Sequence, residues 1–151
     1  MRASLIRCDF AETDLVAGKV HMLGAGWSVT GPQPSMQSVV ALIKVGWTEA
    51  NRSTDFMLRL TDGDGAVVQV PGPTGTQPLE IAGKLEVGRP PGIPEGSEID
   101  ASLVVPVQPL SLTPGQSFTW RLSIGDDEVA SESLYVRPLP AQAGPPPGPA
   151  S

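Results

Sequence analysis

Alternation of apolar and polar side chains is the feature that most limits what this chain can fold into. The clearest case is segment 118–124, which reads Phe-Thr-Trp-Arg-Leu-Ser-Ile. A period of two residues is typical of a strand that buries one face and exposes the other. The pattern recurs over 56–61, 79–87 and 99–107, whereas helical periodicity is almost absent. Because one face of each strand stays polar, these segments predict antiparallel rather than parallel sheets.

Turn-forming residues separate the alternating segments. Asp62-Gly63-Asp64-Gly65 and Gly125-Asp126-Asp127 predict hairpin turns, and glycine and proline each occur 17 times in the 151 residues. We therefore expect an all-β fold, a two-sheet antiparallel sandwich (Ig-like or jelly-roll-like), with a small closed barrel as the alternative. About eight or nine strands are expected, because some of ten candidate segments should merge. The segments are 3–11, 19–23, 26–30, 38–47, 53–61, 66–71, 78–87, 98–107, 117–124 and 129–137.

Two of the three tryptophans, one apolar run and the single cysteine bear on the core. In segment 39–47 both odd-numbered and even-numbered positions carry apolar residues, so both faces of a strand there would be apolar. This predicts a central strand. Trp47 and Trp120 fall on apolar faces and are expected in the core. Cys8 lies on the same face of its predicted strand as Ile6 and Phe10. We therefore expect it to be a small buried residue.

Charge and composition restrict the partners and the location. Ten Lys and Arg against 16 Asp and Glu give a net charge of −6, with no basic cluster, so we expect neither nucleic acid nor a membrane as partner. The amino end reaches Asp9 before an apolar region long enough for a secretory signal. The single cysteine excludes an internal disulfide. These observations predict a cytoplasmic protein.

A change in composition near Arg137 predicts the domain boundary. Residues 138–151 contain six prolines and no charged residue. Such a segment cannot bury enough apolar surface to offset the entropy of ordering. We expect a β-sandwich domain over 1–137 and a disordered, proline-rich tail over 138–151.

The residues that could carry catalysis have plainer structural interpretations. His21 is the only histidine and is expected on the surface, and no serine lies in a G-x-S-x-G elbow. Two acidic groups, 62–64 and 126–128, lie in predicted turns, which Asp favours. The first resembles the start of a calcium loop, but Pro73 stands where the bidentate Glu would be. We expect no catalytic residue, no metal and no cofactor.

Gly24-Ala25-Gly26-Trp27 is the most unusual local feature. It is not a dinucleotide loop, because Val29 stands at the third glycine position. Glycines beside a tryptophan in a β protein indicate a bulge or a ring lying across bare backbone. The functional alternative is a ligand groove lined by Trp27, with Gly24 and Gly26 beside it.

Several segments resemble a family of small bacterial proteins of unknown function. Its members begin M-R-x-x-L, continue with D-x-A and carry a G-G-G-W-like segment; here these are 1–5, 9–11 and 24–27, with Ala25 in place of a glycine. Segments 56–65 and 115–125 fit its L-L-D-x-D-G turn and P-G-x-Y-x-W/F-R-L strand, with Phe118 in place of the tyrosine. The resemblance spans 1–137. It implies a cytoplasmic β-sandwich without an assigned activity.

Three functions remain open from the sequence. The first is a non-enzymatic protein-interaction or assembly module that binds another protein or copies of itself, because extended sheet edges and proline-rich segments are both recognised through preformed backbone. The second is a small-ligand binder, for example of a carbohydrate, that uses Trp27 and neighbouring carboxylates. The third is an enzyme that relies on Asp and Glu alone.

Overall fold

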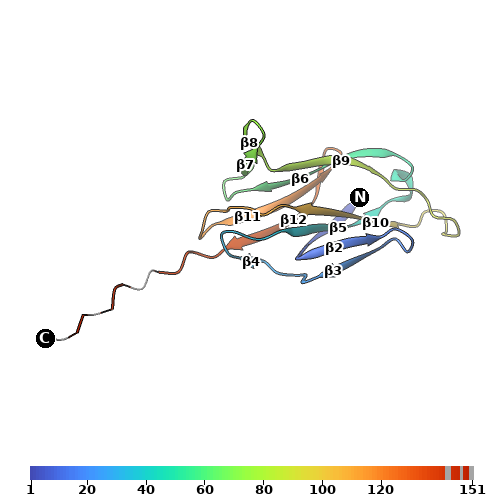
Figure 1. Cartoon of the computed structure of the whole chain (residues 1–151). Helices are drawn as coiled ribbons and strands as arrows, with labels where there is room; N and C mark the ends of the chain where they lie inside the picture. Colours follow the sequence, from blue (N-terminus) through green and yellow to red (C-terminus); the bar gives the residue numbers. More distant parts are fainter. Residues whose placement is uncertain (142–143, 147, 150–151) are drawn as a thin grey trace.

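The chain folds into two main sheets packed face to face (Figure 1). A computed structural model describes residues 1–141, 144–146 and 148–149. The three-stranded sheet has the order β1-β5-β10, and the five-stranded sheet has the order β4-β12-β11-β6-β9. The strands of the first sheet are Arg2–Cys8, Gln37–Val45 and Ile99–Val107. Those of the second, in the order given, are Val29–Thr30, Asp127–Val136, Ser117–Ile124, Ser53–Thr61 and Glu80–Glu86.

Two hairpins complete the strands. The first is formed by β2 (Phe10–Asp14) and β3 (Lys19–Leu23), and the second by β7 (Gln69–Gly72) and β8 (Gly75–Pro78). The pairings are antiparallel except that of β4 with β12, which is parallel. The described strands form separate sheets rather than one closed sheet. The predicted all-β sandwich is therefore confirmed, and the closed-barrel alternative is wrong.

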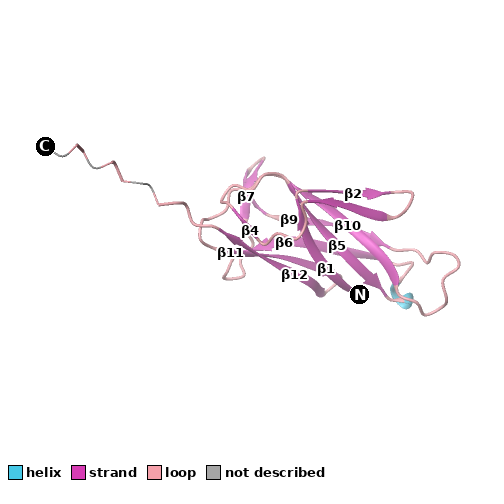
Figure 2. Cartoon of the chain, turned by 90° about the horizontal axis from the view of Figure 1, so that it is seen from below, coloured by secondary structure: helices cyan, strands magenta, loops and turns pink. Residues whose placement is uncertain are grey.

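Strand β5 is central, as its apolar residues at both odd and even positions predict. It lies between β1 and β10, and its residues at 39, 41, 43 and 45 are buried against the five-stranded sheet. Its opposite face is covered in part by the β2–β3 hairpin, where Val40 packs with Cys8 and Ala11. Figure 2 shows this hairpin as a layer outside the three-stranded sheet. A strand covered on both faces needs apolar residues at consecutive positions.

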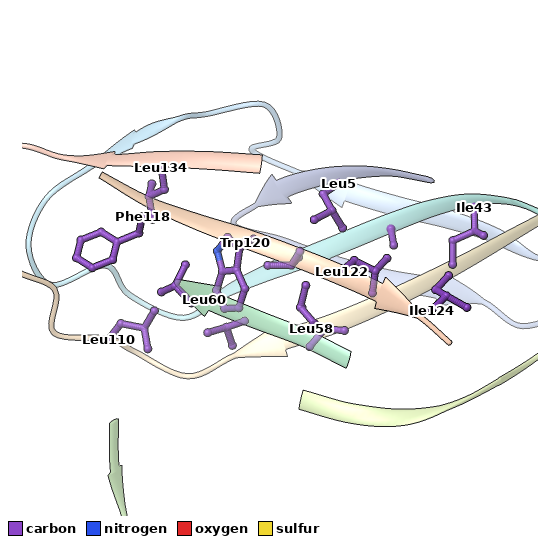
Figure 3. Packing of buried hydrophobic residues seen from close by; sticks show 14 of the residues in the cluster. Leu5, Ile43, Leu58, Leu60, Leu110, Phe118, Trp120, Leu122, Ile124 and Leu134 are labelled. Carbon is purple, nitrogen blue, oxygen red and sulfur yellow. The ribbon is translucent and has the colours of Figure 1, made fainter. Parts of the chain in front are cut away.

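The main core lies between the two sheets. Trp120 is fully buried, among Leu58, Leu60 and Leu122 (Figure 3), so its predicted core position is confirmed. Trp47 is only partly buried, which corrects the prediction that it belongs to the core. It lies in a 3-10 turn, Trp47–Glu49, after β5 has ended, and the Arg89 guanidinium stacks on its ring at 4.5 Å.

Several predicted boundaries are wrong. Segment 3–11 breaks at Asp9, because the Asp9 N–H bonds to the Leu23 C=O and the chain turns into the β2–β3 hairpin. Phe10 is consequently exposed rather than buried with Cys8. Segment 26–30 shortens to β4, and segment 66–71 pairs mainly with β8, a strand that the alternation did not predict. The described chain has twelve strands rather than eight or nine.

The predicted tail falls partly outside the described residues. Residues 138–141, 144–146 and 148–149 have no regular structure, and residues 142, 143, 147, 150 and 151 lie outside the description. The disorder predicted for 138–151 and the boundary at 137 therefore stay predictions.

Candidate functional site

A pocket of about 230 Å³ lies at the end of the sandwich where β1 ends and β5 begins. We call it the end pocket. Its lining comes from the loop after β1, the segment 27–30 and the loop that leads into β5. The lining residues are Asp9, Trp27, Val29, Thr30, Pro34, Ser35, Met36 and Gln37.

Gln37 is a polar side chain that is buried at this end of β5. Odd-numbered residues of β5 face the second sheet, so Gln37 takes an inward position that Val39 and Ala41 continue with apolar side chains. It is 2% exposed. Both its amide nitrogen and its amide oxygen are buried without a hydrogen-bond partner among the described residues. A buried polar group without a partner is destabilising, because folding removes its bonds to water and replaces them with none.

Arg7 lies behind Trp27 and bridges the two sheets. It is 1% exposed, and its Nη2 forms an ion pair with Glu132 Oε1 of β12 at 3.2 Å. Its Nε donates a hydrogen bond to the Trp27 C=O at 3.2 Å, and its guanidinium lies 5.5 Å from the centroid of the Trp27 ring. Burial lowers the pKa of Arg7, and the charge of Glu132 opposes that shift. Glu132 thus stabilises a charge that burial penalises.

Trp27 lines the end pocket with a partly buried ring, which is the position its predicted role in a ligand groove requires. Its indole Nε1 is buried without a partner among the residues that the structure describes. The predicted neighbours Gly24 and Gly26 are not among the lining residues. Their involvement in binding stays a prediction.

The two glycines instead shape the backbone next to the end pocket. Gly24 has φ +63°, and a Cβ there would lie 2.6 Å from Asp9 Cγ, so the Asp9 carboxyl group packs against bare backbone. Gly26 has φ +90°, and its N–H donates to the Arg7 C=O at 2.9 Å. The loop therefore holds Asp9 at the rim and Trp27 beside Arg7.

Exposed apolar side chains occur in the lining of the end pocket and in the segments that adjoin it. Val29 and Met36 line it, and Val29 is the register partner of Tyr135 across β4 and β12. Phe10 follows Asp9 in the chain and pairs with Leu23 across the β2–β3 hairpin. We call these five residues the apolar corner. They are five of the nine large apolar side chains that are exposed among the described residues.

A larger groove, of about 640 Å³, lies between the β2–β3 hairpin and the outer face of the three-stranded sheet. Most of the charged groups in its lining are paired. Arg2 forms an ion pair with Glu98, and Lys44 forms one with Asp100. This groove has no buried polar atom that lacks a partner among those that the structure describes. It is a weaker candidate than the end pocket.

The other sequence candidates do not assemble into a catalytic site. The side chain of His21 is exposed, and its Nε2 lies 4.0 Å from Asp14 Oδ2. Cys8 is fully buried, and burial raises the pKa of its thiol, which disfavours the thiolate that a nucleophile needs.

The two acidic turns lie far apart. The register of β6 and β11 pairs Thr61 with Thr119 and Phe56 with Ile124, which places turns 62–65 and 125–127 at opposite ends of the sheet. Asp62 Oδ1 accepts hydrogen bonds from the N–H groups of Asp64 and Ala66, so it has the turn-forming role that the sequence predicts. Within the described part of the chain, no three His, Cys, Asp or Glu side chains are grouped so that they could hold a metal ion.

Fold and site together define an all-β sandwich with a polar pocket and an apolar corner at one end. A model described as a family of unknown function (DUF6941) matches residues 3–137, and the chain belongs to this family. This agrees with the resemblance to an uncharacterised family, whose individual motifs stay predictions.

No curated protein matches the chain. Among the described residues, no helix has the length and apolar character to cross a bilayer.

Proposed function

We propose that this chain is a non-enzymatic protein-interaction module that docks its partner, another protein or a second copy of itself, on the apolar corner. The observation that carries the proposal is that five of the exposed apolar side chains lie in the lining of one pocket or in the segments that adjoin it. Apolar side chains grouped on one face are typical of interaction sites, whereas single ones are common on any surface. Phe10 and Tyr135 add aromatic groups of the kind that dominate binding energy at interfaces.

The placement of the carboxylates supports binding rather than catalysis. The two acidic turns, 62–65 and 125–127, lie at opposite ends of the five-stranded sheet, so their carboxylates cannot act together. Cys8 is buried away from solvent, and the exposed His21 has its Nε2 4.0 Å from Asp14 Oδ2. We place the protein in the cytoplasm, as its single cysteine favours.

The test compares the full chain with a variant in which Leu23 is replaced by glutamate. Self-association is measured by light scattering across a concentration series, and partner capture by pull-down from the source cells. We expect the Leu23→Glu variant to lose the association that the parent chain shows, because a charge cannot be desolvated without a partner. Leu15→Glu is the matched control, since Leu15 is exposed at the tip of the same hairpin but lies outside the apolar corner. A monomeric parent chain that captures nothing, or equal losses in both variants, would contradict the proposal.

A further inference from the structure

Two residues that line the end pocket carry hydrogen-bonding groups that have no partner among the described residues. Gln37 contributes a donor and an acceptor, and Trp27 contributes an indole donor, all three atoms buried without a partner. Two residues of the same small pocket thus carry three such atoms. Unpartnered buried groups are rare in folded proteins, and their concentration at a cavity points to a ligand that completes them.

The mixture of donors and acceptors indicates an uncharged ligand. A hydroxyl group both donates and accepts, so it can satisfy the amide of Gln37 and the indole of Trp27 together. The charged group that lines the pocket does not favour an anion, because it is the carboxylate of Asp9. Arg7 is not among the lining residues; its Nη2 is paired with Glu132, and its Nη1 is buried without a partner among the described residues.

The apolar part of the lining suits the carbon framework of the same ligand. Val29, Pro34 and Met36 line the pocket beside the ring of Trp27. A sugar presents C–H surface as well as hydroxyl groups, so one molecule can contact the apolar residues while it bonds to the polar ones. Pockets that bind small molecules typically combine apolar walls with a few fixed polar groups.

We propose that the end pocket binds an uncharged, hydroxyl-rich small molecule, namely a monosaccharide or one sugar unit of a larger glycan. Gln37 and Trp27 donate hydrogen bonds to its hydroxyl oxygens, and Gln37 also accepts one from a hydroxyl group. This binding is separate from the docking of a protein partner on the apolar corner. Either can fail while the other holds.

The test follows the indole N–H signals of the ¹⁵N-labelled full chain by NMR during titration with sugars. The probes are glucose, galactose, mannose and N-acetylglucosamine, with acetate and phosphate as anion probes. Trp27→Phe assigns the Trp27 signal, because it removes one of three indole signals. We expect at least one sugar to shift that signal with a dissociation constant of about 1 mM, as a ligand of this size allows.

Two variants and a control decide whether the named groups are responsible. Gln37→Met keeps the length of the side chain and removes its amide, and Trp27→Phe removes the indole donor. Sugar binding, followed by saturation-transfer signals of the sugar, should weaken about tenfold or more in each variant. Gln116→Met, at an exposed position, should bind as the parent chain does. A dispersed amide spectrum confirms that each variant is folded.

Four results would overturn the proposal. They are no response to any sugar up to ~50 mM, a response to acetate or phosphate alone, unchanged binding in the two variants, and equal weakening in Gln116→Met. The Leu23→Glu comparison is read by light scattering and pull-down, so failure of the sugar site leaves that result intact.

Discussion

Two inward-facing polar residues distinguish one end of this sandwich from an ordinary core. Arg7 and Gln37 occupy positions that their own strands otherwise fill with apolar side chains such as Leu5 and Val39. The two differ in how they are compensated. Arg7 has Glu132 and the Trp27 carbonyl as partners of Nη2 and Nε and leaves only Nη1 without one, whereas neither amide atom of Gln37 has a partner among the described residues.

The ion pair of Arg7 leads to a prediction about stability. Glu132→Gln leaves the charge of Arg7 buried without a counter-ion, so the free energy of unfolding should fall by about 1–3 kcal/mol. This is less than a fully buried pair would lose, because Glu132 is partly exposed. Urea unfolding measures the change.

Glu128→Gln is the matched control for that prediction. Glu128 also lies on β12 and pairs with an arginine, Arg121, at 3.0 Å, but the Arg121 side chain is 37% exposed. An exposed pair contributes about 0–1 kcal/mol. Equal losses in the two variants would show that the burial of Arg7 has no energetic effect.

At the scale of elements, alternation predicts strands well and their ends less well. The bounds of β3, β6 and β11 agree with the predicted segments, because each alternates regularly and ends at a turn or a break in the pattern. The break at Asp9 could not be predicted in this way. The alternating pattern that includes Cys8 continues to Phe10 without a break. The chain leaves the sheet because the Asp9 N–H bonds to the C=O of Leu23, a residue distant in sequence.

The residues of the end pocket, too, could be predicted only in part from the sequence. The glycine-rich segment points to Trp27, which does line the end pocket, but the sequence pattern did not single out Gln37 or Arg7. A signal for Arg7 was present, because it shares parity with Ala3 and Leu5 of β1 and should therefore face inward. For Gln37 the burial depends on the second sheet, and no local pattern indicates which sheets meet.

The loop between β3 and β4 can be tested at Gly24. Gly24→Ala places a side chain where φ is +63° and where the Asp9 carboxyl group lies. The left-handed backbone alone should cost about 1–2 kcal/mol, and Asp9 must move away from the rim of the end pocket. Thermal unfolding measures the cost.

Gly63→Ala is the control for the loop. The φ of Gly63 is not positive, and a Cβ at this position would meet no atom within 4 Å. Its replacement should therefore change the free energy of unfolding by less than about 0.5 kcal/mol. Unchanged stability in Gly24→Ala would mean that the loop adopts another path in solution.

At the scale of the whole molecule, the buried core of the described residues ends before the proline-rich segment begins. The buried apolar residues among those described lie between Leu5 and Val136, and the Arg137 N–H still bonds to the Thr30 C=O of β4. Leu139, the next large apolar residue, is exposed. Figure 1 shows the chain leaving the sandwich at this point, next to β4.

A chain that ends at Arg137 should therefore unfold at the same temperature as the full chain, within about 1 °C, because no buried side chain or strand pairing of the described residues is removed. A chain that ends at Leu134 tests the other side of the boundary. It loses the fully buried Val136 and the pairing of β12 with β4. Burial of one such side chain contributes about 1.5–3 kcal/mol, so the unfolding temperature should fall by about 5 °C or more. If the chain that ends at Arg137 showed an equal fall in unfolding temperature, residues after 137 would have to pack on the sandwich. The domain would then extend beyond the predicted boundary.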